Sequence, residues 1–347
     1  MKWILGFSSI FFIQLFFSTA GALEVIQNEG RIYLQSQKCA AIESELQLLQ
    51  DWTVKLNPDK GCHFSKDEVR GQNFCQYDIT ECVPDHVQKY QGKNSYFPGP
   101  NCWNLALVMN GILPALRFTS QKEAAFYFHS PLCHQLAKKD VKQAGDIGAI
   151  RSKDDKGELE EVHAFVYVSD QLAYSKNGAW RVASYELMSL KDLLNFYDVP
   201  PEEECSNLQQ KNKACDTSLT YFRCTPMPQF MKSLEDIPLF ILNFIKEIEV
   251  FEKALQDRTL NGYILPEDRI AIFIQSVNDF ILSLENDIKL KKVDPSENKK
   301  LLLQSIEYRI SSIKDQLGYT KDRKWESQLG KRQKRIQRDL RFFQEKK

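Results

Sequence analysis

The sequence predicts an α+β protein in which a helix packs on an antiparallel sheet and a helical bundle follows at the C-terminus. Residues 162–169 are rich in β-branched and aromatic side chains, as in a strand. A charged loop separates them from residues 144–151, which fit a turn followed by a short strand. After Cys224, apolar residues recur every three or four positions, which is the period of an amphipathic helix. We therefore expect four parts, at residues 1–22, 23–87, 88–228 and 229–347.

Residues 1–22 have the pattern of a cleaved signal peptide. Lys2 precedes an apolar run from Trp3 to Phe17, and the small residues Ala20-Gly21-Ala22 follow as a cleavage site. The run is shorter than the roughly 18 residues that favour a membrane-spanning helix, and no cysteine follows the cut as in a lipoprotein. We expect a secreted or periplasmic protein with no transmembrane span in the mature chain.

The chain has nine cysteines, so at least one stays without a partner in the chain. In an oxidising compartment exposed thiols are usually paired, and an odd count indicates an intermolecular bridge or a reactive thiol. We expect two groups of four to pair within themselves: Cys39, Cys62, Cys75 and Cys82, and Cys133, Cys205, Cys215 and Cys224. The first group lies in residues 23–87, which we interpret as an irregular cap, and Cys102 remains free.

The sequence around Cys102 independently favours it as the special thiol. Pro98-Gly99-Pro100 interrupts any preceding element, and Asn101 is a good N-cap for a helix through the apolar run from Trp103 to Leu113. In the first turn of that helix, unpaired N–H groups and the helix dipole stabilise a thiolate. The alternative is an inert structural cysteine on a core helix.

His163 is the histidine best placed to act as a base for this thiol. It opens the strand predicted at residues 162–169, where alternation puts Ala164 and Val166 on one face and His163 and Phe165 on the other. We expect the Ala164 face to pack in the core and the helix of Cys102 to pack near His163 on the opposite face.

These segments resemble the NlpC-type cysteine peptidases of the papain superfamily over residues 88–190. The resemblance rests on NCWNLAL with Cys102, Gly145-Asp146-Ile147, HAFVYVS with His163, and the following strand QLAYSKNG. It implies a papain-like catalytic domain at residues 88–228 that needs no cofactor and cleaves amide bonds in bacterial cell-wall peptides. The chain departs from the family at its nucleophile, where Asn101-Cys102-Trp103-Asn104 replaces the usual Asp-Cys-Ser-Gly.

The resemblance also implies a role for each residue. His163 takes the thiol proton, and a third residue orients its ring; direct spacing selects Ser175 for this position, and Asn177 is the alternative. The Cys102 N–H and a side chain from the preceding loop would hold the oxyanion. The candidates for that side chain or for substrate contact are Tyr90, Tyr96 and Asn101.

The C-terminal third is expected to be a bundle of three or four helices. Apolar stripes predict one helix from Phe230 to Leu255, a second from Pro266 to about Leu290, and a third that begins at Asp294-Pro295 and ends at Gly318. The last 27 residues contain eleven Lys or Arg and four acids, which suits an anionic polymer as well as a simple solvated helix face.

Several partners and functions are disfavoured or left open by the sequence. No nucleic-acid fold signature accompanies the basic tail, and His129, Cys133 and His134 lack a fourth ligand at the spacing of a metal site. We expect peptidoglycan or a peptide as substrate for a secreted cysteine hydrolase. The alternatives are a non-catalytic envelope protein on the same scaffold and an acyl transferase.

Overall fold

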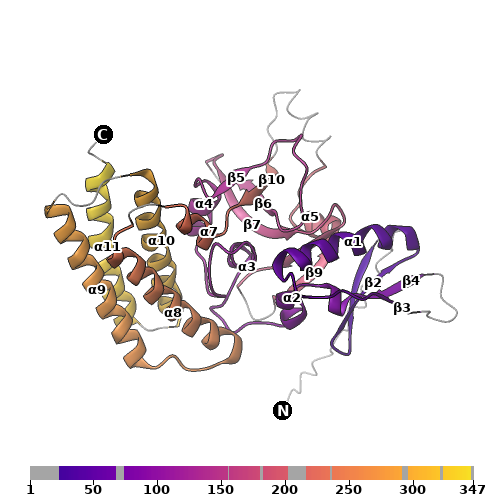
Figure 1. Cartoon of the computed structure of the whole chain (residues 1–347), viewed down its shortest axis with the longest axis horizontal. Helices are drawn as coiled ribbons and strands as arrows, with labels where there is room; N and C mark the ends of the chain where they lie inside the picture. The colour runs from indigo at the N-terminus through magenta and orange to yellow at the C-terminus, as the bar shows by residue number, and fades with distance from the viewer. Residues whose placement is uncertain are drawn as a thin grey trace, which may run out of the picture.

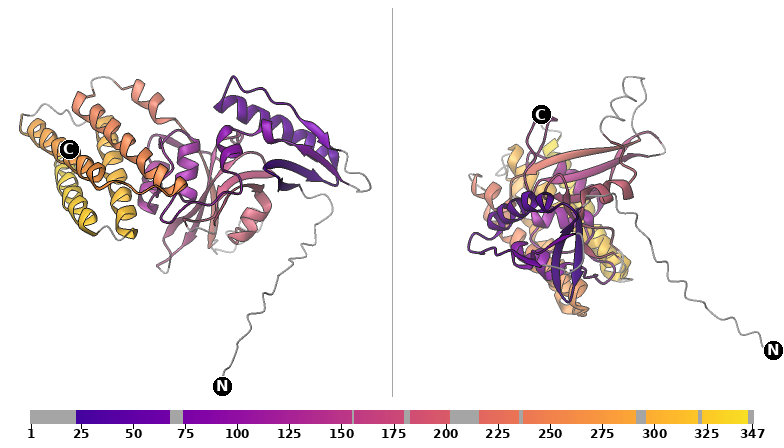
Figure 2. Two further views of the ribbon diagram at one scale, coloured as in Figure 1. Left: turned by 90° about the horizontal axis from the view of Figure 1, so that it is seen from below. Right: turned by 90° about the vertical axis from the view of Figure 1, so that its right-hand side faces the viewer.

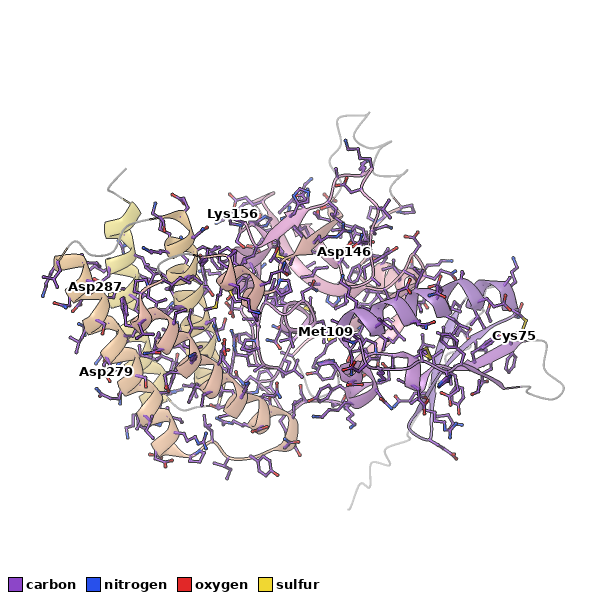
Figure 3. All side chains as sticks on the ribbon, in the orientation of Figure 1. Cys75, Met109, Asp146, Lys156, Asp279 and Asp287 are labelled. Carbon is purple, nitrogen blue, oxygen red and sulfur yellow. A yellow bond between two sulfur atoms is a disulfide. The ribbon has the colours of Figure 1, made fainter. Side chains whose placement is uncertain are left out.

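The computed structural model describes residues 23–67, 74–154, 156–179, 183–201, 216–234, 237–290, 296–320 and 323–344. Figure 1 shows three parts along the longest axis: an N-terminal sheet with one long helix, a central sheet, and a bundle of long helices. In Figure 3, Cys75 lies at the outer end of the N-terminal part, and Met109 lies near the middle of the molecule.

The N-terminal part is a regular α+β unit, so the expectation of an irregular cap is wrong. Its antiparallel sheet has the order β1-β2-β4-β3, and the 18-residue helix α1 follows β2 in sequence. Buried residues alternate in β2, as in a strand with one buried face. In the helix α1, which follows closely, they recur every three or four positions, as in a helix with one buried face. The elements are β1 Glu24–Asn28, β2 Arg31–Ser36, α1 Cys39–Leu56, β3 Ser65–Asp67 and β4 Cys75–Asp78.

Three disulfides support the fold. Cys39–Cys75 joins the start of α1 to β4, and Cys62–Cys82 closes a second loop of the N-terminal part. Cys133–Cys224 joins β5 to β10 in the central sheet. Each of these pairs lies within one of the two expected groups, while Cys205 and Cys215 lie outside the described residues. Disulfides of this kind suit an oxidising compartment.

The central sheet is antiparallel, with the order β5-β10-β6-β7-β8-β9. The strands expected within residues 144–151 and at residues 162–169 correspond to β6 and β7, whereas the inserted strand β10 was not anticipated. The strands are β5 Cys133–Gln135, β6 Ile147–Lys153, β7 Leu159–Tyr167, β8 Leu172–Lys176, β9 Tyr185–Ser189 and β10 Thr217–Cys224. The short helices around them are η1 Thr80–Cys82, α2 Asp85–Tyr90, α3 Cys102–Met109, α4 Gln121–Phe128, α5 Leu190–Phe196 and α7 Met227–Lys232.

Both faces of the central sheet are covered, which corrects the expected position of the Cys102 helix. Leu105 and Met109 of α3 pack with Val166, on the face that also carries Ala164. The opposite face of β7, with Phe165, packs against α5 instead. Because α5 follows β9 directly, it returns over the face on which the sequence placed the Cys102 helix.

The bundle consists of four long helices in the described ranges, as expected, but two of their boundaries differ. The helix predicted from Phe230 is divided: α7 ends at Lys232, and α8 begins after Pro238, which sets the extended backbone at its N-cap. The helix α10 is capped by Ser296, whose hydroxyl accepts from the Lys299 N–H at 3.4 Å, while Asp294-Pro295 lies outside the described residues. The helices are α8 Leu239–Asn261, α9 Glu267–Lys289, α10 Glu297–Tyr319 and α11 Arg323–Gln344.

The bundle shares its apolar core with the central sheet. Phe128 on α4 and Phe222 on β10 belong to the same buried cluster as Phe244 on α8 and Ile306 on α10. The left view of Figure 2 places the bundle directly beside the central part of the molecule. Nowhere in the described ranges is there a helix long and apolar enough to span a membrane.

A buried ionic network crosses this boundary. Arg117, which lies between α3 and α4, donates two hydrogen bonds to Glu123 at 2.6 and 2.8 Å and one to Glu252 of α8 at 2.7 Å. Glu252 also accepts two hydrogen bonds from Arg309 of α10, at 2.6 and 3.0 Å. The Arg117 backbone N–H donates to Asn104 of α3 at 3.1 Å, so the network connects the bundle to the helix that begins with Cys102.

Candidate active site

Cys102 is the first residue of α3, and its cap is the one that the sequence predicts. The Asn101 side-chain oxygen accepts from the Asn104 N–H at 3.0 Å. The helix ends sooner than the expected Leu113, because Gly111 takes a left-handed conformation with φ of 66° just beyond the cap Asn110. Among the cysteines that the structure describes, Cys102 alone is free, and it is buried.

The Cys102 sulfur lies where β7 and β8 separate. The two strands are paired at Val166 with Tyr174 and at Tyr167 with Ala173, and the described pairing does not continue towards His163. There the backbone N–H groups of Ala164 and of the first residues of α3 act on the Cys102 thiol and lower its pKa. The thiol therefore occupies a place in which main-chain donors face a developing negative charge.

Burial nevertheless keeps this thiol protonated in the resting structure. Desolvation raises the pKa of Cys102 to about 11, although the hydrogen bonds and the positive charge of Lys176 act in the opposite direction. A neutral thiol is a weak nucleophile, so a base must take its proton before or during attack.

His163, Ser175 and Asn177 form a hydrogen-bonded chain that fixes such a base. His163 Nε2 lies 2.9 Å from Ser175 Oγ, and the Ser175 hydroxyl donates to Asn177 Oδ1 at 3.3 Å. Because the only Ser175 proton goes to Asn177, Ser175 accepts from Nε2–H of His163. This assigns the proton to Nε2 and leaves Nδ1 as the basic nitrogen. The two residues that the sequence offered as alternatives are thus linked to His163 in one chain of hydrogen bonds.

The environment of His163 holds it neutral. Burial lowers its pKa to about 3, and its Nδ1 is buried without a hydrogen-bond partner. The ring is stacked against Tyr197, which follows α5, with ring centroids 4.1 Å apart. Since Nδ1 has no partner, the imidazole and the Cys102 thiol are not hydrogen-bonded to each other in this arrangement. The site is closed, with both groups neutral.

Lys176 is a site residue that the sequence analysis missed. It is fully buried on β8 and donates to the carbonyls of Ala183 at 2.7 Å and Gly178 at 3.0 Å. Desolvation lowers its pKa to about 8. Strand alternation could have predicted its burial. Leu172, Tyr174 and Lys176 share one face of β8, and the apolar Leu172 and aromatic Tyr174 indicate that this face is buried.

Tyr197 was also missed, and no local pattern pointed to it. It packs on the α5 face of the sheet beside Phe165 and is close enough for a charge on Cys102 to raise its pKa. Its place over His163 depends on the way α5 folds back over the sheet, which local sequence does not encode.

The three loop candidates are placed differently from one another. The Asn101 amide donates to the Thr119 carbonyl at 2.7 Å, so it supports the loop after α3. Tyr90 is buried and packs on His86, with centroids 4.7 Å apart. Tyr96 is half exposed and lies beside Gly262 at the end of α8. Neither tyrosine has a described contact with Cys102.

The Gly-Asp-Ile segment has a structural role here. Gly145 has φ of 97°, and the buried Asp146 carboxylate accepts from the Gln143 N–H at 2.7 Å and from Arg223 at 2.8 and 2.9 Å. These bonds fix the turn before β6 and tie it to β10. Within the described ranges, no three His, Cys, Asp or Glu side chains gather closely enough to hold a metal ion.

Comparisons with known proteins add no family assignment. No protein-family model, no curated protein and no solved structure matches the chain.

Proposed function

We propose that the protein is an exported cysteine hydrolase that cleaves amide bonds in bacterial cell-wall peptides. The observation that carries the proposal is a free cysteine, Cys102, at the start of α3, influenced by the main-chain N–H of Ala164 on β7. The residue before Ala164 is His163, which is hydrogen-bonded to Ser175, and Ser175 in turn to Asn177. The choice of cell-wall peptides as the substrate class rests on the resemblance to NlpC-type peptidases.

In the proposed reaction, His163 Nδ1 takes the thiol proton as Cys102 Sγ attacks the carbonyl carbon of the scissile amide. The tetrahedral anion collapses when the imidazolium gives its proton to the leaving nitrogen, which releases an amine and leaves a thioester on Cys102. His163 then takes a proton from water, the resulting hydroxide attacks the thioester, and the carboxylic acid leaves as the thiol is restored.

The main-chain donors at Cys102 support the anion in this reaction. The N–H groups of Cys102 and Ala164 both lower the pKa of the thiol, and α3 and β7 hold them in place before substrate arrives. Preorganised donors of this kind need no rearrangement when charge develops, so their contribution is greatest in a dry site.

Substrate entry in this account requires displacement of Tyr197. Cys102, His163 and Ser175 are all buried, and the Tyr197 ring occupies one face of the imidazole. A peptide that replaces this ring would leave the site dry while it brings a carbonyl group to the sulfur.

The basic helix α11 supports a second contact with the cell envelope, to an anionic polymer. From Arg323 to Arg341 its exposed positions are basic apart from Ser327, and Leu329, Ile336 and Leu340 are buried in the bundle. An exposed ridge of basic side chains of this kind suits an anionic chain. The exposed basic residues are Arg323, Lys324, Lys331, Lys334, Arg338 and Arg341.

The test is digestion of purified peptidoglycan by the mature protein, with the released products identified by mass spectrometry. Cleaved peptide stems should appear with the wild-type protein and vanish with Cys102→Ala and with His163→Ala. Digestion that continues in either variant would contradict the proposed mechanism.

The burial of the site favours one alternative, a non-catalytic envelope protein on the same scaffold. In that case Cys102 stays a protonated core thiol, and neither cell-wall peptides nor their analogues increase its reactivity. Alkylation of Cys102 in the presence of solubilised peptidoglycan fragments separates the two functions, since a hydrolase opens for its substrate and a scaffold protein stays unreactive.

A further inference from the structure

Lys176 is a charged group in the candidate site that the Cys–His mechanism leaves without a role. It follows Ser175 on β8, so the two side chains lie on opposite faces of the central sheet. Ser175 reaches His163 on the α5 face, while Lys176 lies on the face that packs against α3. Cys102 begins α3, the helix that packs on the Lys176 face of β8, whereas His163 and Ser175 lie on the opposite face.

The contacts of Lys176 hold its ammonium in a fixed position but do not neutralise it. An ammonium group has three donors, and the described contacts use two of them, on the carbonyls of Gly178 and Ala183. The Tyr185 ring lies 5.3 Å from the nitrogen and adds a cation–π contact. No carboxylate in the described ranges pairs with it.

A buried cation without a carboxylate is costly, which argues against a purely structural role. Apolar packing at this position would stabilise the sheet at least as well. The positive charge of Lys176 interacts with Cys102, because Lys176 lowers the pKa of the thiol and a thiolate at Cys102 raises the pKa of Lys176.

We propose that the Lys176 ammonium, held by the Gly178 and Ala183 carbonyls, is the positive charge that stabilises the anion formed when Cys102 loses its proton and attacks. This role rests on the hydrolase chemistry proposed above. His163 then serves as the proton acceptor, and the lasting positive charge beside the sulfur comes from β8 and not from an imidazolium.

The charge beside Cys102 can be measured from the rates of alkylation by two reagents. Iodoacetate is anionic and iodoacetamide is neutral, and each forms a thioether at the sulfur with loss of iodide. The ratio of their two rates cancels the thiolate fraction and most of the access to the site, so it reports the local charge. Peptide mapping assigns each adduct to Cys102.

In the wild-type protein, this ratio should fall as pH rises through about 8, where Lys176 loses its proton. The other titratable groups that face Cys102 or Lys176 are His163, Tyr185 and Tyr197. Burial lowers the pKa of His163 to about 3 and raises the pKa values of both tyrosines, so none of them titrates between pH 6.5 and 9.5. A ratio that stays flat over this range would overturn the proposal, and no substitution is needed to see it.

Two substitutions extend the test. Lys176→Met removes the charge at similar volume. A nearby opposite charge shifts a pKa by about one unit or more, so alkylation by iodoacetamide at pH 7 should fall about tenfold. Lys176→Arg keeps the charge, should retain the wild-type rate within about threefold, and should keep a high ratio above pH 8. Equal rates in the wild type and Lys176→Met would contradict the role. Because alkylation needs no cell-wall substrate, its failure and a failure of hydrolysis are separate outcomes.

Discussion

The burial of neutral His163 predicts a specific loss of stability in acid. Desolvation lowers its pKa to about 3 in the folded protein, whereas an exposed histidine in the unfolded chain has a pKa of about 6.5. Below pH 6.5 the unfolded chain binds a proton that the folded protein does not bind. The free energy of unfolding therefore falls as pH falls from about 6.5 towards 3, and this loss is absent at neutral pH.

The size of the effect follows from the two pKa values. At pH 5, the unfolded state gains roughly 2 kcal/mol from the protonation of this histidine, while the folded state gains almost nothing. His163→Gln removes the titrating group and offers Ser175 an amide in its place. The variant is expected to be less stable at pH 7.5, but its further loss between pH 7.5 and pH 5 should be smaller than the wild-type loss by about 2 kcal/mol.

Urea unfolding at pH 7.5 and pH 5, followed by far-ultraviolet circular dichroism, measures this difference. The matched control is His134→Gln, because His134 is exposed at the sheet edge on β5. His86, which is also buried with its pKa lowered to about 3, contributes equally to all three proteins and cancels. If His163→Gln loses as much stability between the two pH values as the wild type, then His163 is not the buried neutral base described here.

Three further substitutions probe the fold and the site. Glu252→Gln removes the negative charge between two buried arginines and should cost about 3–5 kcal/mol in urea unfolding; a cost below 1 kcal/mol would show that the network is solvated. Tyr197→Ala exposes the site, so alkylation of Cys102 should accelerate by about tenfold, which corresponds to a fall of one unit in the thiol pKa as desolvation is relieved. An unchanged rate would show that Tyr197 does not shield Cys102. Ser175→Ala removes the acceptor for Nε2–H of His163, and hydrolysis should fall by about a hundredfold in kcat with KM little changed; full activity would remove Ser175 from the mechanism.

Local patterns were sufficient for much of the site. Asn101 before an apolar run predicted the N-cap of α3, and the β-branched run after His163 predicted β7, because both signals depend on a few neighbouring residues. Ser175 was selected by its spacing from His163 in the resemblance to NlpC-type peptidases. The hydrogen bond between His163 and Ser175, across the ends of β7 and β8 that are no longer paired, is seen only in the structure.

The remaining features depend on contacts between distant segments. Alternation assigned His163 and Ala164 to opposite faces correctly, but the sequence does not say which helix covers which face. The burial of Lys176 and the stack of Tyr197 on His163 arise from that choice. In the N-terminal part, α1 contains an apolar stripe at helical spacing that includes Ile42. The charged residues between its positions made this stripe hard to recognise in the sequence.

The measurement that tests the central claim most directly is the location of the acyl group during turnover. The wild-type protein is mixed with solubilised cell-wall peptides, quenched in acid and mapped by peptide mass. The mechanism predicts a thioester on Cys102 in the wild type and none in His163→Ala. Hydrolysis that proceeds with no adduct at Cys102, or that persists in Cys102→Ala, would contradict the assignment of Cys102 as the nucleophile.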